Sequence, residues 1–164
     1  ERAMGPYSDK SLSGLIADGN DRLSQADAAL TAGDGARAAA DIGALRRSIH
    51  ALRRDAGVIE LSDCVFELAP IMDALRNVAT RFASNTAEAG EIVQASAALH
   101  AQLQRCNDLA APDIAGQAEF RRLIDGATAS AQEIRAAREG DAGLVHRYEI
   151  ELQSFVNLLD FRFG

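Results

Sequence analysis

The chain has 164 residues and a formal net charge of −7, from 24 acidic and 17 basic residues. Apolar residues make up 48% and aromatic residues 5%, so we expect a folded protein of helices packed through small side chains. The acidic balance, with a pI of about 4.9, argues against binding to nucleic acid or an anionic membrane. No apolar run is long enough to span a membrane and the N-terminus lacks a signal-peptide pattern, so we expect a soluble, cytoplasmic protein.

The first half of the chain predicts two helices. Apolar residues at helical spacing indicate the first over residues 8–32, and the glycines and aspartate of TAGDG predict its end and the start of the next. The second helix, residues 35–56, has the clearest pattern in the chain. Its apolar residues recur at alternating steps of three and four and continue to Ile59: Ile42, Leu45, Ile49, Leu52, Ala56 and Ile59. We expect this stripe to face a core.

Four more helices are predicted over residues 60–82, 87–110, 117–138 and 141–161. Pro70 implies a kink or a restart within the first of them. Asn85 or Thr86 is the expected cap of the next helix. APDIAG, residues 111–116, is the clearest interruption, and the EGD turn at 139–141 joins the last two helices.

These elements predict an all-α protein in two parts. Residues 1–110 are expected to form an antiparallel up-down four-helix bundle. Residues 111–164 are expected to form a C-terminal helical hairpin that packs on the bundle or makes a dimer interface. The last helix has a broad apolar face, the candidate surface for a homodimer or another partner: Phe155, Leu158, Leu159, Phe161 and Phe163.

The segment RRSIHALRR, residues 46–54, places cations all around one histidine. Residues three and four positions apart are neighbours on a helix, and those of His50 are all arginines: Arg46, Arg47, Arg53 and Arg54. Gly43 and Gly57 lie on the same helical row as His50. Because glycine adds no bulk, these two positions could let a partner surface approach closely.

This arrangement favours phosphoryl chemistry at His50. Nearby cations favour a neutral imidazole, because they repel a further positive charge, and neutral imidazole is the nucleophilic form. The same arginines would stabilise an attached phosphoryl group through charge-assisted hydrogen bonds. An arginine-lined patch also suits docking on an acidic partner.

The segment HALRRDA resembles the phosphoacceptor motif of histidine phosphotransfer (HPt) domains of bacterial phosphorelays, His-x-Leu-Lys-Gly-x-Ala. His50, Leu52 and Ala56 match directly, and Arg53 replaces lysine with its charge retained. ALTAGD looks like the family's turn before this helix, and ELSDCVFELA looks like the start of its next helix. The resemblance covers about residues 8–110.

The resemblance implies a four-helix bundle with an exposed phosphoacceptor, His50, and a charge-stabilising neighbour, Arg53. Such a domain passes a phosphoryl group between receiver-domain aspartates, or from a histidine kinase, without a cofactor or catalytic machinery of its own. Two features depart from the family: Arg54 stands where it has a glycine, and its second glycine, near Ile59 or Glu60, is absent.

Alternatives remain open for the same residues. His50 can be a solvent-facing histidine whose neighbouring arginines pair with acidic residues such as Asp55 and Glu60. The protein can also be a non-catalytic sensory or protein-interaction module of a signalling protein, which docks or dimerises without phosphotransfer.

The remaining histidines and the cysteines suggest structural roles. His100 and His146 lie on predicted helices beside apolar residues, and no set of residues has the spacing of a metal site. A disulfide between Cys64 and Cys106 is possible, but two half-buried free thiols are the expected state in a cytoplasmic protein.

Overall fold

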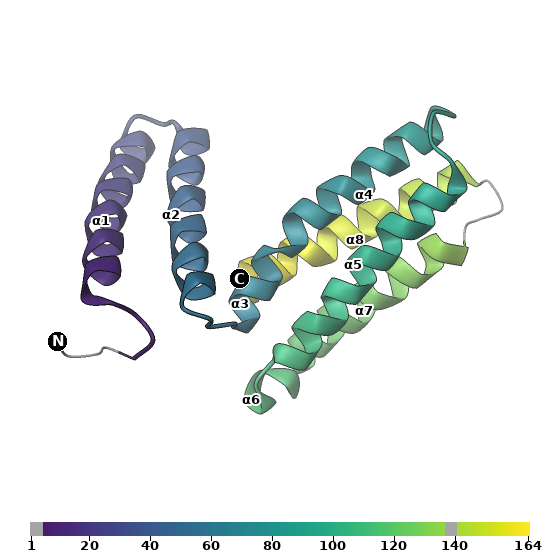
Figure 1. Cartoon of the computed structure of the whole chain (residues 1–164). Helices are drawn as coiled ribbons and strands as arrows, with labels where there is room; N and C mark the ends of the chain where they lie inside the picture. Colours follow the sequence, from purple (N-terminus) through teal and green to yellow (C-terminus); the bar gives the residue numbers. More distant parts are fainter. Residues whose placement is uncertain (1–4, 137–140) are drawn as a thin grey trace. The chain divides into compact units, whose positions relative to one another are not determined.

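The computed structural model describes residues 5–136 and 141–164. In these residues the regular elements are the helices α1 to α8, which confirms the expected all-α class (Figure 1). The contacts divide the chain into two compact units, Glu1–Ile59 and Glu60–Gly164. The first is called the N-terminal hairpin and the second the C-terminal unit.

The N-terminal hairpin consists of α1 (Asp9–Thr31) and α2 (Gly35–Asp55), which pack side by side in opposite directions. The local sequence signals for the turn are confirmed. Gly33 adopts a left-handed φ of 77°, which lets the last carbonyls of α1 accept hydrogen bonds from the turn. Asp34 then caps α2 by accepting a hydrogen bond from the Arg37 amide.

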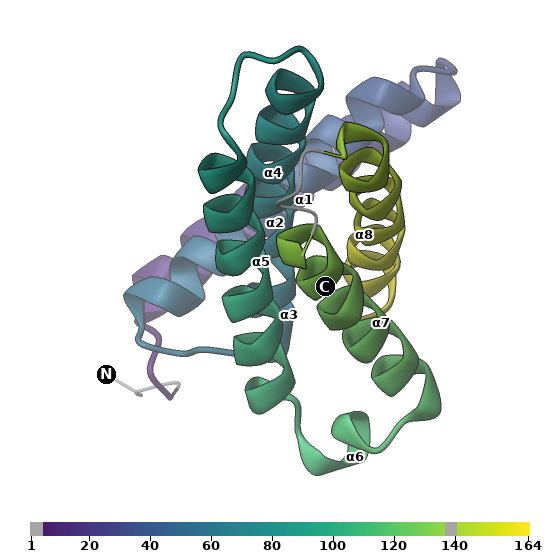
Figure 2. The same cartoon turned by 90° about the vertical axis from the view of Figure 1, so that its right-hand side faces the viewer.

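The C-terminal unit is built around four long helices: α4 (Leu68–Ala83), α5 (Ala89–Leu109), α7 (Ala118–Ala136) and α8 (Ala142–Phe163). Each of them packs against two of the others, in the order α4, α5, α7, α8 and back to α4 (Figures 1 and 2). The short helix α3 (Leu61–Phe66) packs on α5 and α8, and α6 (Pro112–Ala115) lies before α7.

The structure divides the chain after Ile59 rather than after residue 110. The expected C-terminal hairpin, α7 and α8, packs directly on α4 and α5 and supplies half of their common core. The physical reason is that α7 and α8 carry large apolar side chains that fill the core beside α4 and α5. Phe120, Leu123, Ile124 and Leu152 are completely or almost completely buried among Leu68, Met72 and Leu75.

The stripe expected to make α2 a core helix is only half-buried. Ile42 and Ile59 are exposed, Leu45, Ile49 and Leu52 are partly covered, and the buried apolar residue of α2 is Ala38. The pattern correctly predicted the helix but not its burial. In a two-helix unit each helix has one neighbour. That neighbour covers one edge of the apolar stripe, and the other edge remains open to solvent.

The two cysteines form a disulfide, so the expectation of two free thiols is wrong. The Cα atoms of Cys64 and Cys106 are 5.4 Å apart, and both residues are buried in the contact between α3 and α5. Gln102 reinforces this contact, because its side-chain amide donates to the Cys64 carbonyl and to a Glu67 carboxylate oxygen.

Three smaller expectations about helix ends have different outcomes. The predicted restart near Pro70 is confirmed, because α3 ends at Phe66 and α4 begins at Leu68. Neither expected cap begins α5; Glu88 does so through a capping box with Glu91. The predicted EGD turn lies mostly outside the described residues, apart from Asp141, which caps α8.

The broad apolar face expected on the last helix is mostly used inside the C-terminal unit. Leu159 is fully buried, Phe155 packs against the core, and the Phe163 ring meets Phe120 edge to face at 5.1 Å. Leu158 and Phe161 remain exposed. None of the helices in the described residues is long and apolar enough to cross a membrane.

Candidate functional site

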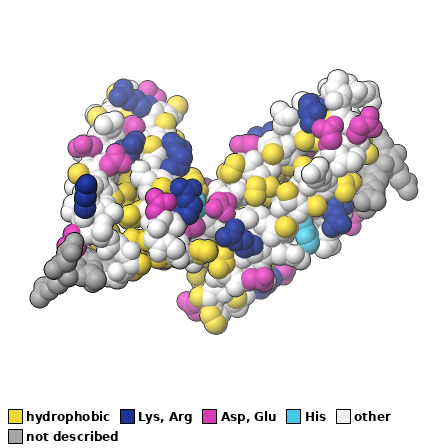
Figure 3. All heavy atoms as spheres, in the orientation of Figure 1, with side chains coloured by type: hydrophobic (Ala, Val, Ile, Leu, Met, Phe, Trp, Pro, Cys, Tyr) yellow, Lys and Arg dark blue, Asp and Glu magenta, His cyan; other side chains and the backbone are white. Residues whose placement is uncertain are grey.

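The structure places His50 and its four arginines on one helix, α2. His50 is half-buried, as are Arg46 and Arg53, whereas Arg47 and Arg54 are exposed. Lys and Arg side chains gather along α2 on the face of the hairpin seen in Figure 3. Each of the four arginines therefore lies within about one helical turn of His50, as their spacing requires.

Contacts within the last turn of α2 offset part of the positive charge of the arginines, so that part needs no ligand. Arg54 pairs with Asp55 at 3.6 Å, which confirms the expected ion pair. Arg53 and Arg54 lie where the helix dipole favours cations, at the C-terminal end of α2. Both residues also accept backbone hydrogen bonds from the turn that ends the helix.

The two glycines on the row of His50 have different surroundings. Gly57 adopts a left-handed φ of 71°, and no atom would lie within 4 Å of an added Cβ. Its conformation closes the turn after α2, so a structural role accounts for it. At Gly43, an added Cβ would lie 3.6 Å from an Arg47 guanidinium nitrogen, so the Arg47 side chain lies over this glycine.

A polar network joins α1 to α2, and its α2 residues lie between the turn of the hairpin and His50. Asp18 accepts hydrogen bonds from Arg22 at 2.8 Å and from the Ser48 hydroxyl at 3.3 Å. The Arg22 hydrogen bond lowers the pKa of Asp18, and the same bond raises the pKa of Arg22. Asp41 also interacts electrostatically with Arg22, and its buried Oδ2 has no hydrogen-bond partner.

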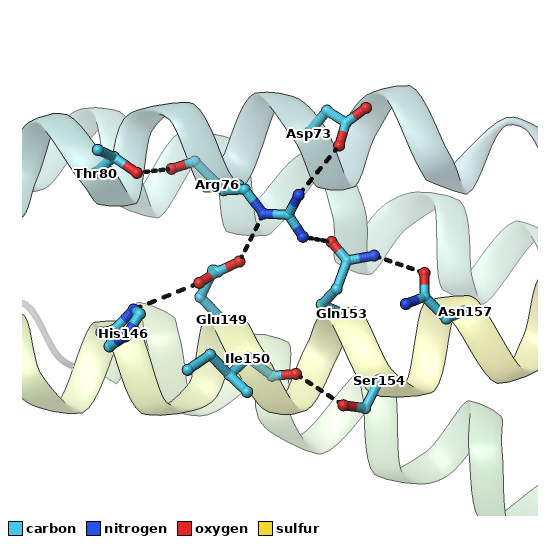
Figure 4. A network of polar contacts seen from close by, with 9 residues as sticks. All are labelled: Asp73, Arg76, Thr80, His146, Glu149, Ile150, Gln153, Ser154 and Asn157. Atoms are coloured by element: carbon cyan, nitrogen blue, oxygen red, sulfur yellow. Dashed lines mark hydrogen bonds and ion pairs between the residues drawn. The ribbon is translucent and has the colours of Figure 1, made fainter. Parts of the chain in front are cut away.

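A second polar cluster, which the sequence analysis did not identify, lies between α4 and α8 (Figure 4). Glu149 is 6% exposed, and its carboxylate accepts a hydrogen bond from Arg76 Nε at 3.2 Å and lies 3.5 Å from His146 Nδ1. Arg76 also pairs with Asp73 and donates to Gln153. These residues fix the register of α4 against α8.

One sequence signal could have identified this cluster. Glu149 interrupts a helical row of α8 that is otherwise apolar and buried, formed with Val145, Leu152 and Val156. A carboxylate in such a row requires a charged partner from a neighbouring helix. A cleft of about 610 Å³ opens beside the cluster, lined by Arg76, Glu149, His146 and small residues of both helices.

The other two histidines have ordinary surroundings. His100 on α5 is half-buried and contacts the Gln132 side chain on α7 at 3.2 Å. His146 is exposed apart from its contact with Glu149. Within the part of the chain that the structure describes, no group of three His, Cys, Asp or Glu residues is placed to hold a metal ion.

Comparisons with known proteins supply no relative for this chain. No family model matches it, and neither the curated proteins nor the solved structures contain a significant match.

Proposed function

We propose that the protein is a phosphotransfer intermediate of a phosphorelay and that His50 accepts the phosphoryl group. The observation that carries this proposal is the placement of Arg46, Arg47, Arg53 and Arg54 around His50 on one helix, with Arg47 and Arg54 exposed. Cations within a helical turn of the imidazole can form charge-assisted hydrogen bonds with a phosphoryl group. The resemblance of HALRRDA to the HPt motif supports the same residue.

The proposed step is in-line displacement. A ring nitrogen of neutral His50 attacks the phosphorus of a receiver-domain aspartyl phosphate, an N–P bond forms, and the P–O bond to the aspartate breaks. The aspartate leaves as a carboxylate, and the proton on the other ring nitrogen remains or passes to solvent. The arginines would offset the charge of the transferred group. The reverse step would deliver the phosphoryl group to a second receiver.

The test is transfer of label from a panel of phosphorylated receiver domains to the full chain. We expect an acid-labile label on the wild-type protein, none on His50→Gln, and undiminished label on His146→Gln. His146 is the matched control because it is exposed and lies on the other unit. Failure of every receiver to label the chain, or label that persists in His50→Gln, would contradict the proposal.

A second candidate function is a non-catalytic interaction module, and the disulfide favours it. Phosphorelay partners of the HPt family are cytoplasmic, whereas disulfides persist mainly in oxidising compartments. The oxidation state of Cys64 and Cys106 in intact cells therefore discriminates between the two functions. Both cysteines are buried, so intact cells are quenched with acid and the denatured protein is alkylated. Both thiols would be labelled if the chain works in the cytoplasm and neither if it works in an oxidising compartment.

A further inference from the structure

The N-terminal hairpin has almost no core of its own. Its cluster of buried apolar residues consists of three alanines, Ala26, Ala29 and Ala38. Four of the large aliphatic side chains of its two helices are exposed: Ile16 63%, Leu23 50%, Leu30 62% and Ile42 39%. The other five are only half-buried: Leu12, Leu15, Leu45, Ile49 and Leu52. Because three alanines bury little apolar area, they contribute little of the free energy needed to hold two helices together.

The exposed residues recur at a fixed interval. In α1, Ile16, Leu23 and Leu30 are seven residues apart, and in α2 the same interval separates Ile42 from the half-buried Ile49. A seven-residue interval keeps side chains on one face of a helix and is typical of helices that pack in a bundle. Each helix therefore has a row of large apolar side chains along one face, which is called its stripe.

Both stripes lie on the same side of the hairpin. The register is fixed by Asp18, which accepts from Ser48, and by Gly19, where an added Cβ would lie 3.3 Å from Leu45. The residues where the two helices meet include Arg22 and Ala29 of α1 and Asp41 and Ser48 of α2. In both helices the residues of the stripe come one position later in the sequence: Leu23, Leu30, Ile42 and Ile49. Because α1 and α2 run in opposite directions, this equal displacement takes both stripes to one side. At this register Leu23 lies level with Ile42.

We propose that this apolar face, formed by Ile16, Leu23, Leu30, Ile42 and Ile49, binds the same face of a second copy of the chain. Two hairpins packed in this way form an antiparallel four-helix bundle around a two-fold axis. In this dimer the apolar face of each hairpin is buried and supplies the core that the other hairpin lacks.

The size of the face suits a stable dimer. Helices of 23 and 21 residues are about 30–35 Å long, and two packed side by side are roughly 20 Å wide. One side of the hairpin, polar residues included, therefore has a footprint of about 650 Å², which the relief of the side chains brings near the roughly 800 Å² that each partner buries in a standard interface.

Charge also favours a second copy as the occupant. Residues 1–59 contain eight basic and eight acidic residues, whereas residues 60–164 contain nine and sixteen, so the net charge of −7 belongs to the C-terminal unit. Two hairpins do not repel each other as two C-terminal units would. Helical spacing places Asp9 along one border of the face and Arg53 along the other, at similar heights, so a two-fold axis parallel to the helices sets these opposite charges near each other.

The test is the molar mass of the full chain, measured by sedimentation across a concentration series. We expect the wild-type protein to have twice its chain mass of 17.4 kDa, and Leu23→Asp to be monomeric. Leu23→Ala removes apolar area without adding charge and should raise the dissociation constant at least about tenfold, because each dimer loses two leucines. The matched control is Phe161→Asp on α8, an exposed apolar residue of the other unit, which should remain dimeric.

Three results would overturn the proposal. One is a monomeric wild-type chain at high micromolar concentration. Another is a Leu23→Asp variant that remains dimeric with unchanged helicity by circular dichroism. The third is dissociation of the dimer by Phe161→Asp but not by Leu23→Ala.

Discussion

At the scale of single residues, charged groups in this protein have one of two roles. The arginines of α2 lie on a partly exposed helix where Asp55 and the helix dipole already interact with some of them. Arg76, in contrast, compensates a carboxylate that is almost fully buried, Glu149. The first set belongs to the proposed phosphoacceptor site, and the second contributes to the stability of the fold.

The pairing of Arg76 with Glu149 gives a prediction for stability. Arg76→Ala leaves Glu149 buried without its strongest partner, so the free energy of unfolding should fall by about 1–3 kcal/mol. The double variant Arg76→Met/Glu149→Leu should recover most of this loss, because neither charge remains. Urea unfolding of the full chain measures both values. If the double variant loses the sum of the losses measured for Arg76→Met and Glu149→Leu separately, the pair is not coupled.

Sequence reasoning succeeded at residues whose role depends on their own backbone. Gly33 and Asp34 end and begin helices as predicted, because a left-handed turn and an N-cap are properties of a few consecutive residues. Helical spacing likewise fixes which arginines neighbour His50 on α2, whereas a functional role for this group stays a prediction. Spacing does not show which groups from other elements approach them, and for that reason Glu149 and Arg76 were missed.

At the scale of elements, the order and approximate bounds of the long helices could be predicted, but their partners could not. The stripes of α2 and α4 look alike in sequence, yet Leu75 of α4 is fully buried whereas Ile42 of α2 is exposed. Periodicity reports which side of a helix is apolar, and burial depends on which other helices are available. The disulfide was not predicted from sequence for a related reason, since 42 residues separate its cysteines.

The disulfide gives a prediction for the contact between α3 and α5. Reduction removes a link that closes a loop of 42 residues, and the chain-entropy relation gives a loss of about 4 kcal/mol in the free energy of unfolding. Cys64→Ser/Cys106→Ser is the control, because the reductant should not change the midpoint of a variant that has no disulfide. The measurement is urea unfolding with and without a phosphine reductant. An unchanged midpoint after complete reduction would exclude a stabilising role for the disulfide.

At the scale of the whole molecule, the two units differ in the size of the apolar core that stabilises them. The C-terminal unit has a continuous core of large side chains closed by a disulfide. The N-terminal hairpin, which carries His50, has a cluster of three alanines and an exposed apolar face. If the hairpin completes its core only by association, its stability depends on protein concentration and that of the C-terminal unit does not.

Amide hydrogen exchange of the full chain at low and high micromolar concentration tests this claim most directly. We predict that amides of residues 9–55 are weakly protected at the low concentration and become strongly protected at the high one. Amides of residues 61–136 and 142–163 should be equally protected at both. Strong protection of residues 9–55 at every concentration would contradict the account, because it would show that the hairpin is stable without a second copy.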